Sequence, residues 1–290
     1  MEMMNLNYYQ KDKSVIMENM DSFDIEAILE CGQCFRFTKL GEKEYRIIAY
    51  NKVLYIHQTK NQVEFYPCTL AEFKQIWVRY FDLDRDYNDI KQRLSEDEVM
   101  KKAIDYASGI RILNQQTWEC LVSFIISQNN RIPMIKKVIE NISQRYGTEI
   151  EKGLYTFPDL EQLSKATEEE LYECKAGFRA KYIINACQMI KSGEINLSEF
   201  KNMSTQQVRD KLMSIKGVGP KIADCVLLFS QGRTEVFPTD VWIKRVMNYF
   251  YFKEEVGIKE IHLYAYEKFG DLAGLAQQYL FNYARMGKIG

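Results

Sequence analysis

The strongest local pattern in the chain is a glycine turn between two helical segments, in Leu212-Met-Ser-Ile-Lys-Gly-Val-Gly-Pro-Lys-Ile-Ala-Asp-Cys-Val-Leu-Leu-Phe. Gly217 and Gly219 permit positive φ and remove side chains, so backbone N–H groups of the turn and of the following helix can approach a phosphate closely. Such contacts position nucleic acid without recognising its sequence. An ordinary helical hairpin with glycines for packing has the same pattern, so the turn alone supports both interpretations equally.

Two charged residues favour chemistry at this turn. Lys221 begins the second helix, and Asp240, within Pro238-Thr-Asp-Val-Trp, is the expected N-cap of another helix. An unprotonated lysine amine is a nucleophile, and both desolvation and a helix N-terminus disfavour its ammonium form. A carboxylate at an N-cap is favoured as the anion. In one cleft, the anion could stabilise a cationic sugar transition state while the amine attacks C1′. The anion would also raise the pKa of the lysine, and the sequence leaves open which effect is larger. Taken singly, such a lysine is usually a solvated charge and such an aspartate only a cap.

The composition is that of a soluble globular protein, with 46% hydrophobic and 27% charged residues in a chain of 290 residues that we expect to form two domains. No stretch approaches the roughly 20 apolar residues of a membrane span, and the first ten residues lack the pattern of a signal peptide. We therefore expect a cytoplasmic, nucleoid-associated protein. The seven cysteines are scattered and odd in number, which favours free thiols. Cys31 and Cys34 lack the further ligands of a zinc site.

The charge is unevenly distributed along the chain. The formal net charge is −1, but residues 1–100 sum to −5 and residues 101–290 sum to +4. Any surface that binds nucleic acid is therefore expected mainly in the second part.

An antiparallel sheet is expected near the N-terminus. Residues 44–68 are rich in aromatic and β-branched residues, with turn-like breaks at Asn51-Lys52 and Lys60-Asn61, which predicts a meander. Cys34-Phe-Arg-Phe is predicted as a further strand. Helical periodicity begins near Leu70.

After residue 105 the pattern is almost entirely helical. Helices are predicted over Trp118–Gln128, Pro133–Tyr146, Glu168–Lys175, Ala180–Lys191, Thr205–Ile215, Lys221–Phe229 and Val241–Tyr251. The predicted class is α+β, with an antiparallel sheet domain over residues 1–105 and a helical domain over residues 106–290 that carries the helix-hairpin-helix at 206–229.

These residues resemble the helix-hairpin-helix Gly/Pro…Asp superfamily of base-excision glycosylases, and within it the 8-oxoguanine DNA glycosylase family. The resemblance covers almost the whole chain, with the motifs in the family order. They are Cys31-Gly-Gln-Cys-Phe-Arg-Phe, Phe124-Ile-Ile-Ser-Gln-Asn-Asn, Ala176-Gly-Phe-Arg-Ala-Lys-Tyr, Gly217-Val-Gly-Pro-Lys-Ile-Ala-Asp-Cys, Pro238-Thr-Asp-Val and Leu275-Ala-Gln-Gln-Tyr-Leu-Phe.

The resemblance implies that the target nucleotide is flipped from the duplex into a pocket. In that pocket the backbone carbonyl of Gly32 would accept the N7 hydrogen that distinguishes 8-oxoguanine from guanine. Cys225 and Phe281 would sandwich the base, Gln277 would bind its Watson–Crick edge, and Pro238 would line the pocket. Without the resemblance, Cys225 and Phe281 are more simply core residues, Gly32 a bend and Gln277 an exposed helical residue.

The resemblance also assigns contacts to DNA. Asn129 would fill the space vacated in the duplex, Phe178 would wedge the stack, and Arg179 would contact the estranged base. The simpler alternatives are a helix C-terminal cap at Asn129 and Asn130, and loop surface at Phe178 and Arg179. Phosphates would be held by hairpin amides near Gly217, Gly219 and Ile222, and a structural cation by the carbonyls of Met213, Ile215 and Val218. His57 and His262 match no motif.

Two residues depart from the best-known eukaryotic members. Met134 stands where those members have an arginine that reads the opposite cytosine, and methionine has no donor for it, which predicts relaxed opposite-base preference. Trp242 replaces a histidine next to Asp240, which puts that phosphate contact in doubt. The chain ends at Gly290 without a basic nuclear-targeting tail, so a prokaryotic member is expected.

The resulting hypothesis is a bifunctional glycosylase and AP lyase, acting as a monomer on double-stranded DNA that contains 8-oxoguanine. It would need no cofactor and would form a Schiff base through Lys221.

One alternative is a glycosylase for another oxidised base, of the endonuclease III branch. That branch commonly has four C-terminal cysteines for an iron–sulfur cluster, whereas no cysteine follows Cys225. The adenine-mismatch and alkylated-base branches typically lack the lysine. The other alternative is a non-catalytic helix-hairpin-helix DNA-binding protein, which needs neither Lys221 nor Asp240.

Overall fold

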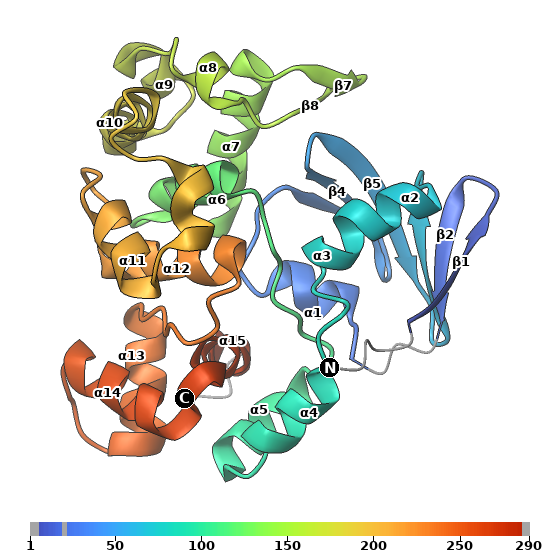
Figure 1. The fold of residues 1–290 in the computed structure, drawn as a ribbon, viewed down its shortest axis with the longest axis vertical. Coiled ribbons are helices and arrows are strands. Elements are labelled where there is room, and N and C mark those ends of the chain that lie inside the picture. The colour runs from blue at the N-terminus through green and yellow to red at the C-terminus, as the bar shows by residue number, and fades with distance from the viewer. Residues whose placement is uncertain (1–5, 19–21, 286–290) are drawn as a thin grey trace.

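The computed structural model describes residues 6–18 and 22–285 and places an antiparallel sheet beside a larger helical part (Figure 1). The predicted α+β class is confirmed. The sheet has the order β1-β2-β6-β5-β4-β3, and each neighbouring pair is antiparallel. Its strands are β1 (Asn7–Lys11), β2 (Ser14–Glu18), β3 (Phe37–Gly41), β4 (Glu44–Ala49), β5 (Lys52–Gln58) and β6 (Gln62–Tyr66).

The predicted meander is confirmed as β4, β5 and β6, with turns at both predicted breaks. The first two strands were not predicted from the sequence. The strand predicted at Cys34-Phe-Arg-Phe is wrong in its bounds, because β3 begins at Phe37. Cys34 packs in the core of the sheet and Phe35 in the core of the helical part, so this segment crosses between the two cores. The carbonyl of Gln33 accepts a hydrogen bond from the Gln115 side chain, at 2.7 Å, and not from a strand.

Short helices flank and follow the sheet. They are α1 (Ile25–Glu30), α2 (Leu70–Glu72), the π-helix η1 (Phe73–Trp77), α3 (Val78–Tyr80), α4 (Tyr87–Leu94) and α5 (Glu98–Tyr106). α4 and α5 contribute to the helical core, and α5 packs against α15 (Ala273–Tyr283), whereas the sheet core is built from residues of the strands, α1 and the α2–α3 region. The boundary at residue 105 stays a prediction.

The helices predicted in the second part are present near the expected positions. The elements of this part are α6 (Thr117–Ser127), α7 (Ile132–Tyr146), β7 (Glu149–Glu151), β8 (Leu154–Tyr155), α8 (Leu160–Leu163), α9 (Glu168–Glu173), η2 (Gly177–Arg179), α10 (Ala180–Lys191), η3 (Leu197–Asn202), α11 (Thr205–Met213), α12 (Pro220–Gln231), α13 (Val241–Met247), η4 (Asn248–Phe252), α14 (Ile258–Phe269), η5 (Gly270–Leu272) and α15. The helix predicted over Val241–Tyr251 is divided, since the regular α-helix ends at Met247 and a π-helical turn, η4, follows.

The seven cysteines are all buried free thiols, as predicted. Within residues 6–18 and 22–285, no helix combines the length and the apolar character needed to cross a bilayer.

Candidate active site

The hairpin consists of α11, a turn and α12, which has Gly219 as its N-cap. Gly217 has φ +83°, and a Cβ there would lie 2.4 Å from the ring of Tyr182 on α10, so this position requires glycine. Gly219 does not use the positive φ that glycine permits, because its φ is −94°. A Cβ at Gly219 would meet no atom within 4 Å, so its backbone faces open space and can be approached.

Several amides of the turn are already bonded. Asn185 accepts from the amide of Lys216 at 2.7 Å, the Ile215 carbonyl accepts from the amide of Val218 at 3.0 Å, and the Gly219 carbonyl accepts from the amide of Ile222 at 3.0 Å. Among the described residues, no partner is found for the amides of Gly217 and Gly219. The two glycines therefore offer the free donors that an anion at this turn would use, whereas the predicted amide of Ile222 is engaged within the helix.

Lys221 lies in the first turn of α12, partly buried against aromatic side chains. Its Nζ is 5.3 Å from the ring centroid of Phe124 on α6, and Phe124 stacks in turn on Phe229 with centroids 5.6 Å apart. Cys225 follows Lys221 by one helical turn and is 3% exposed. An aromatic ring and a buried thiol are therefore the neighbours of the amine.

Asp240 is the N-cap of α13, as predicted, and its carboxylate accepts a hydrogen bond from the amide of Ile243 at 2.8 Å. Burial raises the pKa of the Cys225 thiol to about 11; the charge of Lys221 opposes this rise, and the carboxylates of Asp224 and Asp240 add to it. The charges of Lys221 and Asp240 therefore influence the same buried, neutral thiol in opposite directions.

Gly32 and Phe281 are far apart in the sequence and adjacent in the structure. Gly32 has φ +84°, and a Cβ built on it would lie 3.2 Å from Cε1 of the Phe281 ring. Gln277, four residues before Phe281 on α15, is 5% exposed, so the alternative of an ordinary exposed helical residue is wrong. Its Oε1 is buried and has no partner among the described residues. Such an unpaired acceptor costs about 1–3 kcal/mol unless a ligand uses it.

Arg179 is 8% exposed, so the alternative of loop surface is wrong for this residue. Its Nε donates to the Gln128 carbonyl at 2.8 Å and its Nη2 donates to the Asn129 carbonyl at 2.9 Å. In this structure the guanidinium supports the turn after α6 and does not point outward toward a base. Phe178 is 41% exposed, with the Arg179 guanidinium 4.4 Å from its ring centroid, and it can serve as a supported wedge.

Asn129 lies at the tip of the turn after α6. It is exposed and has φ +46°, whereas Asn130 caps α6 by donating to the Ile126 carbonyl at 3.1 Å. The cap interpretation therefore applies to Asn130, and the side chain of Asn129 remains available. Met134 lies in the first turn of α7, the helix that follows this turn, and is 44% exposed.

The remaining predicted residues lie around this centre. Pro238 is buried, whereas Trp242 is 52% exposed with the Arg245 guanidinium 5.4 Å from its ring centroid. Within the described part of the chain, no three His, Cys, Asp or Glu side chains are grouped as a metal site.

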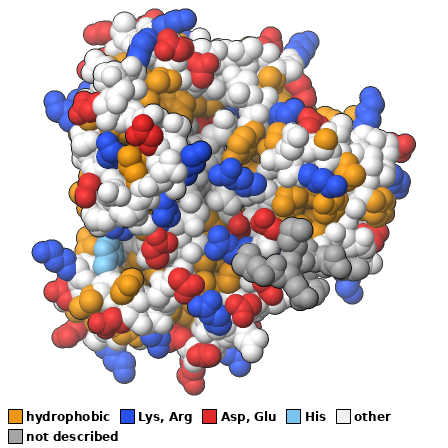
Figure 2. All heavy atoms as spheres, in the orientation of Figure 1, with side chains coloured by type: hydrophobic (Ala, Val, Ile, Leu, Met, Phe, Trp, Pro, Cys, Tyr) orange, Lys and Arg blue, Asp and Glu red, His pale blue; other side chains and the backbone are white. Residues whose placement is uncertain are grey.

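Basic side chains also come from the sheet. A groove of about 420 Å³ between β3–β4 and α7 is lined by Arg36, Arg46, Lys136 and Lys137, with Glu140 as its acidic residue. Figure 2 shows Lys and Arg side chains along the boundary between the sheet and the helices on this face. Positive charge is therefore not confined to the second part of the chain.

Some residues near the site were not singled out from the sequence. Phe124 and Gln33 stand within the quoted motifs, so the motifs contained their signal. Tyr182 and Gln278 also stand within quoted motifs, but the contacts through which they act exist only in the folded chain. His262 lies in no quoted motif and is brought to the site by its contact with Thr239.

Comparison with known proteins gives the family. A model described as 8-oxoguanine DNA glycosylase, N-terminal domain, matches residues 15–121, and a model described as HhH-GPD superfamily base excision DNA repair protein matches residues 122–268. The chain is 30% identical to an N-glycosylase/DNA lyase of Saccharomyces cerevisiae, over 91% of this chain and 84% of the yeast protein.

Two solved structures resemble the whole chain. One is MBOgg1 in complex with a low affinity DNA ligand, at 48% identity and a TM-score of 0.96, covering 99% of this chain and 100% of that one. The other is the Clostridium acetobutylicum 8-oxoguanine glycosylase/lyase in complex with double-stranded DNA containing cytosine opposite 8-oxoG, at 44% identity and a TM-score of 0.95, with the same coverage. The chain therefore belongs to the 8-oxoguanine DNA glycosylase family of the HhH-GPD superfamily.

Proposed function

We propose that this chain is a bifunctional base-excision repair glycosylase and AP lyase that removes 8-oxoguanine from double-stranded DNA. The observation that carries the proposal is the placement of Lys221 and Asp240, each at the start of a helix, with the Lys221 amine beside the Phe124 ring and Cys225 one turn further along α12. The relatives named N-glycosylase/DNA lyase, and the clostridial 8-oxoguanine glycosylase/lyase, support the same activity.

The proposed mechanism begins at the glycosidic bond. The Asp240 carboxylate stabilises positive charge on the sugar as the bond breaks, and the departing base takes the bonding electron pair. The unprotonated Lys221 amine attacks C1′, and the resulting adduct loses a proton as the sugar ring opens to give a Schiff base. Loss of the C2′ proton then expels the 3′ phosphate with its electron pair, which is β-elimination.

Recognition of the base would use the residues around Gly32. The Gly32 carbonyl would accept the N7 hydrogen of 8-oxoguanine, and the unpaired Oε1 of Gln277 would accept a donor of the Watson–Crick edge. Phe281 would cover one face and Cys225 the other. A thiol with a pKa of about 11 is neutral at physiological pH, so it adds no anion beside the base.

The opposite strand would be held with little discrimination. Met134 offers no hydrogen-bond donor to cytosine, so we propose excision opposite several bases. Phe178 and Asn129 would fill the duplex where the nucleotide has left. Arg179 would reach the estranged base only after releasing the Gln128 and Asn129 carbonyls.

We propose further that the chain acts as a monomer, in the cytoplasm of a prokaryote, without a cofactor. The carbonyls of Met213, Ile215 and Val218 would hold a structural cation at the hairpin; the Ile215 carbonyl accepts one hydrogen bond and keeps a second lone pair for it.

Borohydride trapping on duplex DNA containing 8-oxoguanine tests the proposal. We expect a covalent adduct with the unchanged chain and none with Lys221→Gln. Lys216→Gln, an exposed residue of the same turn, is the matched control and should trap normally. DNA binding without any adduct from the unchanged chain would favour the non-catalytic alternative, and an adduct that persists in Lys221→Gln would refute the assigned nucleophile.

A further inference from the structure

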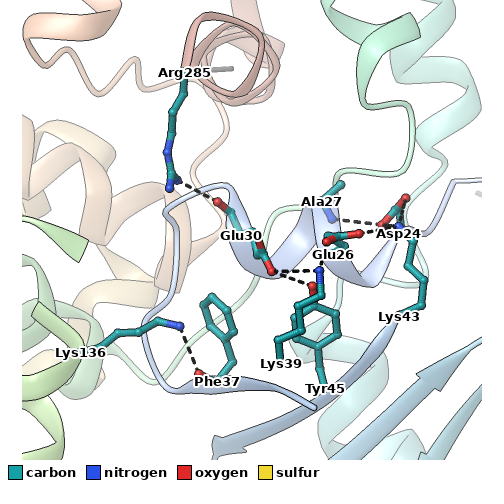
Figure 3. Close-up of polar contacts among 10 residues, drawn as sticks. All are labelled: Asp24, Glu26, Ala27, Glu30, Phe37, Lys39, Lys43, Tyr45, Lys136 and Arg285. Atoms are coloured by element: carbon teal, nitrogen blue, oxygen red, sulfur yellow. Dashed lines mark hydrogen bonds and ion pairs between the residues drawn. The ribbon is translucent and has the colours of Figure 1, made fainter. Parts of the chain in front are cut away.

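Three successive backbone carbonyls at the end of α1 differ in their hydrogen bonding. The Glu30 carbonyl accepts from Nη1 of Arg285 at 2.9 Å (Figure 3), and the Cys31 carbonyl accepts from Nε2 of Gln278 at 2.9 Å. Within the described residues, the Gly32 carbonyl accepts no hydrogen bond. We name Glu30–Gly32 the recognition loop, and its last carbonyl is its open acceptor.

The two donors come from α15 and from the turn that follows it. Gln278, Phe281 and Arg285 follow one another at steps of three and four residues along α15 and the turn after it, which places them on the same face. The middle residue packs on Gly32 itself. One helix face therefore contacts each residue of the recognition loop in turn.

The sheet holds the loop from the opposite side. The carboxylate of Glu30 accepts from the hydroxyl of Tyr45 at 2.7 Å and lies 3.9 Å from Nζ of Lys39 (Figure 3). These contacts fix the side chain of Glu30, whereas the contacts from α15 fix the backbone.

Gln33 fixes the residue after the loop. It is fully buried. Its side-chain Nε2 donates to the backbone carbonyls of Ile28 and Arg111, each at 2.8 Å, and its Oε1 accepts from the backbone N–H of Leu113 at 2.8 Å. Gly32, at φ +84°, has the backbone freedom of glycine. The direction of its carbonyl therefore depends on how the peptide group before Gly32 and the residue after it are held. Gln278 holds the peptide group before Gly32, and Gln33 anchors the one after it.

We propose that Gln278 and Arg285 are positioning residues for the discrimination of 8-oxoguanine from guanine. By occupying the carbonyls of Glu30 and Cys31 they fix the backbone on the N-terminal side of Gly32 and leave the Gly32 carbonyl as the acceptor for the N7 hydrogen. This inference rests on the proposed function. Gln277 and Gln278 then have separate tasks on α15: the first binds the base and the second aims the carbonyl that recognises it.

The test compares two bases that differ at N7. 8-Methoxyguanine has a substituent on C8, as 8-oxoguanine does, but no N7 hydrogen, so only 8-oxoguanine can use the Gly32 carbonyl as an acceptor. Binding is measured in the Lys221→Gln chain, which leaves the base in place, as the ratio of affinities for duplexes that contain 8-oxoguanine and 8-methoxyguanine.

We expect Gln278→Met to lower this ratio about five- to tenfold, the effect of misaligning one hydrogen bond, by weakening the 8-oxoguanine complex alone. Gln277→Met, its neighbour, should weaken both complexes and keep the ratio. Arg285→Met, at an exposed position, should lower the ratio by a smaller factor and provides a second variant if Gln278→Met fails to fold.

A ratio that stays unchanged in both Gln278→Met and Arg285→Met, or an equal loss of affinity for both duplexes, overturns the inference, since either result shows that the donors only stabilise the fold. A Lys221→Gln chain that itself binds the two duplexes equally refutes the proposed recognition of 8-oxoguanine, and the inference with it.

Discussion

The hydroxyl of Thr239 lies 3.0 Å from Nε2 of His262, which ties the residue before Asp240 to α14. The same hydroxyl lies 3.0 Å from the Phe237 carbonyl, and the tautomer of His262 decides which of the two partners accepts its one proton. The backbone of this segment positions Asp240 at the start of α13. His262 therefore supports the loop that carries the Asp240 carboxylate.

Removing the Thr239 hydroxyl should slow excision. We expect Thr239→Val to lower the single-turnover rate about threefold to tenfold, the effect of losing one hydrogen bond, because the Asp240 loop loses its fixed position. Thr239→Ser keeps the hydroxyl and should retain the rate. The affinity for DNA should be the same in all three chains. Equal rates in the valine and serine variants would contradict the role of this contact.

Asp240→Asn should separate catalysis from structure. Asparagine also caps helices, so the hydrogen bond to the Ile243 amide is kept while the negative charge is lost. We expect excision to slow about 10²- to 10³-fold, as for other removed electrostatic groups, with unchanged DNA binding and thermal stability. Asp240→Ala, which loses the cap as well, should additionally destabilise the fold by about 1 kcal/mol. Parallel loss of binding and excision in Asp240→Asn would make Asp240 principally a cap.

The two hairpin glycines should respond differently to alanine. Gly217→Ala forces a side chain into positive φ and against Tyr182, and we expect it to destabilise the protein by about 2 kcal/mol or more. Gly219→Ala meets open space at a φ of −94° and should leave the unfolding free energy nearly unchanged. It should instead weaken binding to undamaged duplex, measured by titration, if a phosphate approaches this backbone. Unchanged binding in Gly219→Ala would place the phosphate elsewhere.

Met134→Arg should introduce a preference for the opposite base. The position is 44% exposed in the first turn of α7, so an arginine fits there without displacing the core. We expect the unchanged chain to excise 8-oxoguanine opposite all four bases at similar rates, and the arginine variant to favour cytosine about fivefold or more. Single-turnover rates opposite each base measure this. A strong cytosine preference in the unchanged chain would refute the prediction.

The stability of the protein should depend on the protonation of His262. Burial lowers the pKa of His262 below its ordinary value; the Asp224 carboxylate opposes this shift, and the Arg209 guanidinium adds to it. The unfolded chain then binds more protons at mildly acidic pH, so the unfolding free energy falls as pH drops below about 6.5. Denaturant unfolding from pH 7.5 to 5.5 should show a steeper decline for the unchanged chain than for His262→Gln. Subtracting the pH dependence of the His262→Gln chain removes the contribution of other titratable groups. Equal pH dependence in the two chains would contradict a lowered pKa of His262.

The sequence by itself determined the local parts of the site. Helix periodicity and capping depend on neighbouring residues, so the hairpin, the N-cap at Asp240 and the helices of the second part were predicted near their observed positions. The quoted motifs also brought Gly32, Gln277 and Phe281 into one hypothesis before any contact between them was known. The weak alternation of β1 and β2 gave no such signal, and the segment at Cys34 was predicted as a strand although it crosses between the two cores.

The tertiary structure decided how distant segments meet. Gln278 contacts Cys31 across 247 positions, and Phe281 packs on Gly32, because α15 returns to the end of α1. Arg179 proved to hold the turn at Asn129 instead of pointing outward, and His262 acquired a role through Thr239. Side-chain hydrogen bonds of this kind depend on distances of about 3 Å between elements, which the order of residues along the chain does not specify.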